Sequence, residues 1–87
     1  MTDQPEKSLL EKSRDIVSQL KQMRHDAEAN IKNLTDLWLV LDDEMKQKEF
    51  VPRVEELSSH QNAFHEAIES LISDYEIECN RMENEAS

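Results

Sequence analysis

The chain has 87 residues, no glycine, and 20 acidic against 10 basic residues, which gives a net charge of -10. This length bounds it to one small domain, and the negative charge disfavours direct binding to nucleic acid or to anionic membranes. Hydrophobic residues make up 37% of the chain and recur periodically, so we predict a folded chain despite the mean hydropathy of -0.82.

Two further features narrow the class of protein. The N-terminal sequence has no apolar core of signal-peptide length, and the longest apolar run is residues 37–41. We therefore expect neither classical secretion nor a membrane span. Cys79 is the only cysteine, so it has no intramolecular disulfide partner, and we expect a small buried or half-buried side chain.

The first predicted helix spans about residues 5–48. Pro5 suits a first helical turn, and Ser8 with Glu11 offers a second capping box. Apolar residues then recur at a mean spacing of about 3.6, the period of a straight α-helix, which favours a bundle over a continuous coiled coil. This stripe consists of Ile16, Leu20, Met23, Ala27, Ile31, Leu34, Trp38, Leu41 and Met45.

The stripe widens into an apolar belt near its end. The belt consists of Leu34, Leu37, Trp38, Leu39, Val40 and Leu41. At 100° per residue, residues 37–41 cover the whole circumference of a helix, which a surface helix does not need. Because exposing this belt to water would be costly, we expect it to be surrounded. It is either the centre of a homo-oligomeric core or a docking surface for a different protein, and an oligomer that rearranges on partner binding would combine both.

The connection is predicted at about residues 47–53. Pro52 suits the first turn of a second helix and disfavours helical geometry at Val51. The alternative is that Pro52 only kinks one long helix, which would make the chain a rod. The second helix, at about residues 52–83, has the strict 3.5-residue period of a coiled-coil seam. The members of this seam are Val54, Leu57, Gln61, Phe64, Ile68, Leu71 and Tyr75.

Polarity and charge set this second seam apart. Gln61 stands where an apolar residue is expected; in a tight seam it would fix register or partner choice at a cost in stability. The alternative is a loose seam in which the amide reaches water. Residues 50–87 carry nine acidic and two basic residues, against 11 and eight in residues 1–49. Repulsion therefore opposes pairing the second helix with its own copy and favours pairing it with the first helix of another chain, in an antiparallel, interleaved arrangement.

No catalytic or metal-binding constellation is convincing. His65-Glu66 followed by Glu69 matches half of a His-Glu-x-x-His zinc motif, but Glu69 stands where the second histidine must be. Cys79 has no histidine within one helical turn to act as a base, and without glycine there is no Gly-rich phosphate loop. We predict a protein that is not an enzyme and holds no cofactor or metal.

The arrangement resembles the synaptonemal complex central element protein 3 family. The resembling features are an early Pro5-Glu6, Trp38 late in the first helix, Pro52 opening the second, the pair Ala63-Phe64, and the aromatic Tyr75. The resemblance covers nearly the whole chain. It implies an all-α hairpin that forms an antiparallel homodimeric four-helix bundle or a higher oligomer. The implied role is a structural assembly factor in meiotic nuclei that binds the coiled-coil transverse filament protein and other central element proteins.

A different class of role remains open at this point: a small helical subunit of a cytosolic hetero-oligomer, such as a kinetochore ring or a vesicle-tethering complex. In either case we treat residues 1–87 as a single assembly domain. Its predicted interface consists of Leu34, Leu37, Trp38, Leu39, Val40, Leu41, Leu57, Gln61, Phe64, Ile68, Leu71 and Tyr75.

Overall fold

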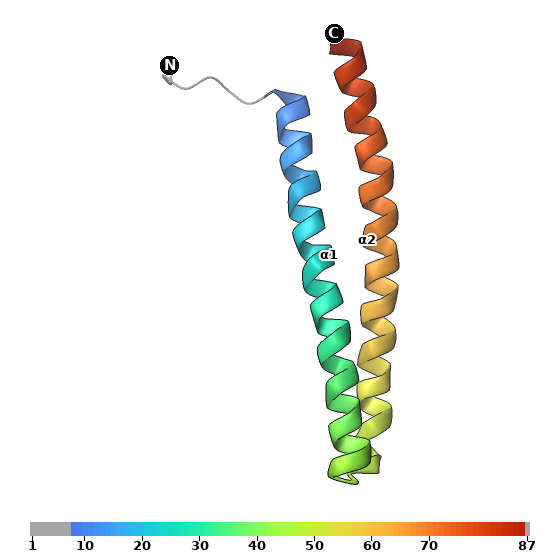
Figure 1. Cartoon of the computed structure of the whole chain (residues 1–87). Coiled ribbons are helices and arrows are strands. Elements are labelled where there is room, and N and C mark those ends of the chain that lie inside the picture. The colour runs from blue at the N-terminus through green and yellow to red at the C-terminus, as the bar shows by residue number, and fades with distance from the viewer. Residues whose placement is uncertain (1–7, 87) are drawn as a thin grey trace, which may run out of the picture.

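The computed structural model describes residues 8–86 and is an antiparallel pair of long helices (Figure 1). Helix α1 spans Leu9–Leu39 and α2 spans Val51–Ala86. Between them lie a π-helical turn, η1 (Val40–Glu44), and a short 3-10 turn, η2 (Lys48–Phe50). Within residues 8–86 there is no strand. The all-α fold class is therefore confirmed, and the start of α1 lies beside the end of α2.

The start of α1 follows the sequence signal. Ser8 is the N-cap, and its Oγ accepts a hydrogen bond of 3.0 Å from the Glu11 N–H, which satisfies one of the free donors of the first turn. The capping role predicted for Ser8 is confirmed. Pro5, the other predicted start signal, lies outside the described residues.

The end of the first helix differs from the prediction. The α-helical pattern stops at Leu39, not near residue 48, and continues only as the wider turn η1. There the Met45 N–H bonds to the Val40 carbonyl oxygen at 2.9 Å, and the Gln47 N–H bonds to the Leu41 oxygen at 2.9 Å. These longer-range bonds satisfy the carbonyls at the helix end while the chain reverses direction.

The chain turns back within residues 45–50. Lys46 adopts a positive φ of 58°, the left-handed conformation that commonly ends helices and that glycine adopts at least cost. With no glycine in the chain, a lysine takes this position. The Lys48 ammonium lies 3.4 Å from the Asp42 carboxylate across the turn. The connection is therefore a true turn, and Pro52 does not merely kink a rod.

Pro52 lies in the first turn of α2, as predicted. The expectation for Val51 is wrong, because Val51 has helical angles of φ -59° and ψ -47°. Its N–H bonds to the Lys48 carbonyl as the end of the 3-10 turn, and its side chain is only 8% exposed. The bias that a proline imposes on the preceding residue is a preference, and here the turn and the burial of Val51 override it.

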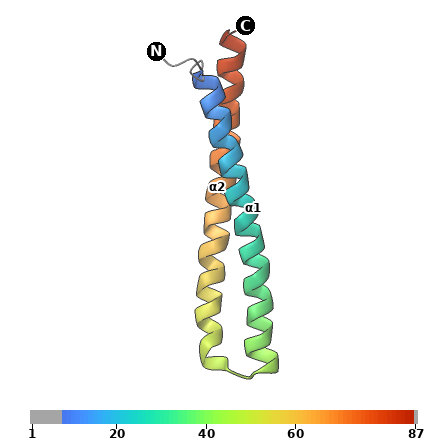
Figure 2. The ribbon, with the colours of Figure 1, turned by 90° about the vertical axis from the view of Figure 1, so that its left-hand side faces the viewer.

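The two helices meet along a seam with strict three- and four-residue steps, and they wrap around each other (Figure 2). The seam consists of the residues of α1 and α2 that face the other helix, and all of them are buried or half-buried. In α1 these are Leu10, Ser13, Val17, Leu20, Arg24, Ala27, Ile31, Leu34 and Trp38; in α2 they are Val51, Val54, Ser58, Gln61, His65, Ile68, Ile72, Tyr75, Cys79 and Met82. This 3.5-residue period is that of left-handed coiled-coil packing.

The predicted 3.6-residue period of the first helix is wrong as a description of what is buried. Ile16 and Met23 are 41% and 46% exposed. The residues that follow them, Val17 and Arg24, face α2 instead. The predicted stripe left the seam at Met23, because the seam residue Arg24 is polar, and at Ile16, where the neighbouring seam residue Val17 is also apolar.

The predicted period of the second helix is confirmed, but three of its seven members are not in the seam. Val54, Gln61, Ile68 and Tyr75 lie in it as predicted, and Cys79 is fully buried there. Leu57, Phe64 and Leu71 are exposed, and Ser58, His65 and Ile72 face α1 in their place. Ser58 and His65 are polar and follow the apolar Leu57 and Phe64, so apolar spacing favoured the wrong residue of each pair.

The hairpin is one layer thick. Its principal extents are 62, 28 and 14 Å, and a helix with its side chains is about 10–12 Å across. In the described part of the chain, neither helix has an apolar stretch long enough to cross a membrane. Domains usually need two packed layers to enclose a core, whereas this hairpin has one layer.

Candidate assembly interface

Each helix carries a row of exposed apolar residues at intervals of seven. These residues immediately precede seam residues, so each row runs along one flank of the seam. In α1 the row consists of Leu9, Ile16, Met23, Asn30 and Leu37; along the turn and α2 it consists of Phe50, Leu57, Phe64, Leu71 and Glu78. The apolar members are between 41% and 71% exposed. We call these two rows together the apolar face.

The two rows lie on the same side of the hairpin. Met23 and Phe64, the middle members of the rows, line the same two neighbouring hollows in the surface. Asn30 and Gln61 line the first hollow with them, and Leu71 lines the second. The apolar face is therefore one continuous surface that both helices build, with the seam as its floor.

Ion pairs cover the opposite flank of the seam, which we call the ionic face. The residues of α2 that take part immediately follow seam residues and are acidic. Lys21 Nζ lies 3.1 Å from Glu76, and Arg24 Nη1 lies 2.9 Å from Glu69; Arg14 pairs with Glu83. These groups are partly exposed, so each pair contributes little to the free energy of unfolding. Their regular placement fixes which flank of the hairpin faces water.

The centre of the ionic face holds the one cluster of possible metal ligands found among the described residues. Glu28, His65 and Glu69 each place a ligand atom within 4.8 Å of the others. Sequence reasoning considered His65 with Glu69 on one helix, but it did not group them with Glu28, which lies on the other helix. His65 Nε2 is 3.0 Å from Glu28, and this hydrogen bond lowers the pKa of the Glu28 carboxyl. Because Arg24 already neutralises Glu69, the geometry is that of an ionic network.

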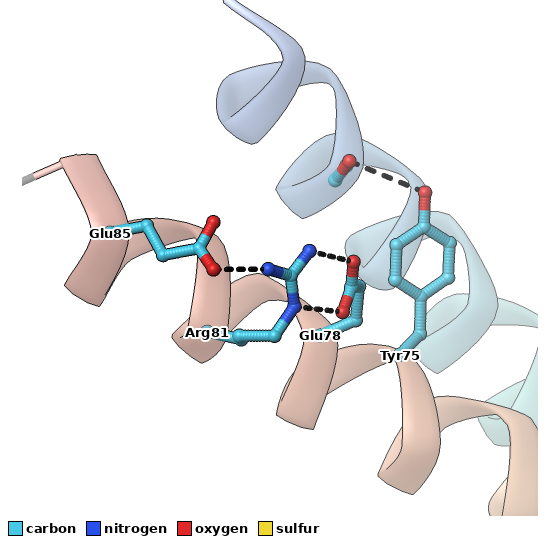
Figure 3. Close-up of polar contacts among 5 residues, drawn as sticks. Tyr75, Glu78, Arg81 and Glu85 are labelled. Atoms are coloured by element: carbon cyan, nitrogen blue, oxygen red, sulfur yellow. Dashed lines mark hydrogen bonds and ion pairs between the residues drawn. The ribbon is translucent and has the colours of Figure 1, made fainter.

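A second polar cluster lies near the end of α2 (Figure 3). Arg81 donates two hydrogen bonds of 2.6 Å to Glu78 and one of 2.6 Å to Glu85. The hydrogen bond to Arg81 lowers the pKa of Glu78, and the same contacts raise the pKa of Arg81. One turn earlier, the Tyr75 hydroxyl lies 3.3 Å from the Ser13 Oγ on α1. This clamp on α2 therefore holds Glu78, the charged last member of the apolar face.

The predicted interface residues divide into two sets. The first set faces the other helix of the same chain or its turn and is buried or half-buried: Leu34, Trp38, Val40, Leu41, Gln61, Ile68 and Tyr75. The second set is exposed: Leu37, Leu39, Leu57, Phe64 and Leu71. Of the exposed set, all but Leu39 lie on the apolar face. The belt is thus only partly surrounded within a single chain.

Sequence reasoning missed Phe50, and it placed Ile16 and Met23 in the seam. The signal that identifies all three is the seven-residue interval they share with Leu37, Leu57, Phe64 and Leu71. Each helix thus has apolar residues both in the seam and on one flank of it. Such a wide apolar stripe is typical of helices in bundles. The apolar face therefore offers a surface on which a further helix can pack.

No known protein family matches the chain, and no significant match was found among curated proteins or solved structures.

Proposed function

We propose that this chain is a non-catalytic structural assembly protein that associates with itself through the apolar face. Two hairpins packed face to face would form an antiparallel homodimeric four-helix bundle, which higher oligomers could extend. The single observation that carries the proposal is the pair of apolar rows, because seven-residue spacing on both helices leaves a continuous surface without cover. Such large exposed apolar surfaces are typical of association sites.

The exposed surface area of the chain supports the proposal that it packs against a partner. A compact monomer of this mass, 10.2 kDa, exposes about 5,300 Å². This chain exposes 6828 Å². The excess is on the order of 1,500 Å², and a standard protein interface buries about 800 Å² on each partner. One further layer of helices is enough to remove it.

We further propose that the assembly acts in the nucleus, associated with meiotic chromosomes. There it would join the midline of the synaptonemal complex and bind transverse filament and other central element proteins. The support is the sequence resemblance, together with a hairpin in which Trp38 closes the first helix and Pro52 opens the second. No direct contact with nucleic acid or membrane is part of this proposal, in keeping with the net charge of -10.

Tagging the chain in meiotic cells tests the proposed role. The expected result is a signal between paired chromosome axes that disappears when the transverse filament protein is removed. A matched Phe64→Glu variant should fail to localise, whereas Ala63→Glu, which adds the same charge at the neighbouring exposed residue, should localise normally. A diffuse cytosolic signal for the unsubstituted chain would instead favour the hetero-oligomer subunit.

A further inference from the structure

The apolar face also carries information about how two copies are oriented. A second hairpin can cover this face in two ways, and in both of them every helix is antiparallel to its neighbours. In one, α1 faces the partner's α2 and the two connections lie at the same end of the bundle. In the other, each helix faces its own copy and the connections lie at opposite ends.

We propose that the partner on the apolar face is a second copy whose α2 covers α1, with both connections at the same end. This inference rests on the proposed self-association and adds its geometry. Charge decides between the two arrangements. Helix α1 carries five acidic and five basic residues and is neutral, whereas α2 carries nine acidic and two basic residues, a net charge of -7.

The arrangement with the connections at opposite ends would place α2 directly against the partner's α2. Two helices of net charge -7 would then lie about 8–10 Å apart. That distance is close to the Debye length at physiological salt, so the repulsion is only partly screened. The same-end arrangement pairs each acidic helix with a neutral one. It also leaves Lys21 and Arg24 of each chain on the ionic face, where they keep their partners Glu76 and Glu69.

The rows also match in the same-end arrangement. The hollows show that Met23 and Phe64 lie at one height on the hairpin. A two-fold axis along the bundle keeps the two copies at the same height and places the α1 residue of one copy opposite the α2 residue of the other. Met23 would then contact the partner's Phe64 and the reverse, a thioether-to-ring contact that is favourable at both sites. Glu78 faces an apolar residue in either arrangement, the partner's Leu9 when the connections share an end or its Phe50 when they do not, so the net charge of the helices remains the deciding difference.

Distance measurements between two spin labels test the orientation. Glu49 is exposed in the turn η2, so Glu49→Cys carries a nitroxide at the connection. Cys79 is fully buried, and the unsubstituted chain treated with the same reagent is the labelling control. The same-end bundle predicts a label separation below about 35 Å, since four helices at 8–10 Å spacing form a narrow bundle. Opposite ends predict a separation near the full 62 Å length of the hairpin.

A second label at the other end of the hairpin, Glu11→Cys, guards against a local effect in the turn. Both labels should give short separations, and the mass should be measured on the same samples. A dimer with long separations at both sites would overturn the orientation and leave self-association intact. A monomer would overturn both the orientation and the proposed function.

Discussion

The two flanks of the helical seam are built from opposite chemistry, although they belong to the same two helices. On the apolar face, Met23 and Phe64 line the same hollow; on the ionic face, Lys21 and Arg24 form ion pairs with Glu76 and Glu69. A solvated antiparallel pair needs ionic groups on both flanks. The difference leaves large apolar side chains exposed on one flank only, which supports the proposal that this flank associates with a partner.

The largest expected effect comes from breaking the seam that both faces share. Trp38 lies half-buried against the other helix, so Trp38→Glu should remove roughly 3–5 kcal/mol from the free energy of unfolding, because it loses a large apolar side chain and places a charge between helices. Circular dichroism should show lost helicity, and the oligomer should disperse. Leu39→Glu, at a neighbouring residue that is 50% exposed, is the control. Equal melting curves for Trp38→Glu and the unsubstituted chain would show that the seam does not depend on Trp38.

A charge on the apolar face should affect association more than folding. Phe64 is 42% exposed in the single chain, so Phe64→Glu costs the hairpin little but would bury a carboxylate between copies. We expect the dissociation constant for self-association to rise by roughly 100-fold or more, about 3 kcal/mol. Sedimentation equilibrium measures it, with Ala63→Glu as the matched control. The same dissociation constant for both variants would exclude Phe64 from the interface.

Replacing the polar residue Gln61, which lies in the seam below the apolar face, should have a smaller effect and should raise the free energy of unfolding. Gln61 lies half-buried in the seam and lines a hollow with Met23 and Phe64. Gln61→Leu should stabilise the chain by about 1 kcal/mol, because it replaces a buried amide with an apolar side chain. Partner choice should loosen at the same time. Urea unfolding measures the first effect, and no change in the midpoint would mean that the amide reaches water.

The ionic face should show the smallest effect, and only in acid. The pKa of Glu28 lies below its ordinary value of 4.5, chiefly because of the hydrogen bond from His65. A carboxyl with a lowered pKa stabilises the folded state above the unfolded pKa, and this stabilisation disappears as the pH falls through the folded pKa. In Glu28→Gln, the melting temperature should therefore depend less on pH below about pH 4.5 than in the unsubstituted chain. Glu66→Gln on α2 is the control, and identical profiles for both variants would show that the His65 contact adds nothing.

Much of the fold follows from local chemistry that a single sequence displays. Ser8 with Glu11 marks the start of α1, and Pro52 marks the start of α2, because caps and prolines act within one helical turn. The end of α1 was harder to predict. Lys46 takes a left-handed conformation without the glycine that usually signals it, so no residue type marks where the helix stops.

The seam could not be assigned from apolar spacing alone. At Arg24, Ser58 and His65 the seam side chain is polar and its preceding neighbour is apolar, so apolar spacing selects the neighbouring row. At Val17 and Ile72 the preceding residue is apolar as well, so spacing does not distinguish the two rows. These neighbouring rows form the apolar face. Apolar spacing alone therefore assigns to the core residues that the hairpin leaves exposed.

The most direct test of the central claim, that the apolar face binds a second copy, is the mass of the purified chain by light scattering. The account predicts a highly helical species of twice the 10.2 kDa chain mass or a higher multiple, and a lower mass for Phe64→Glu but not for Ala63→Glu. A stable, fully helical monomer of 10.2 kDa at all concentrations would contradict it.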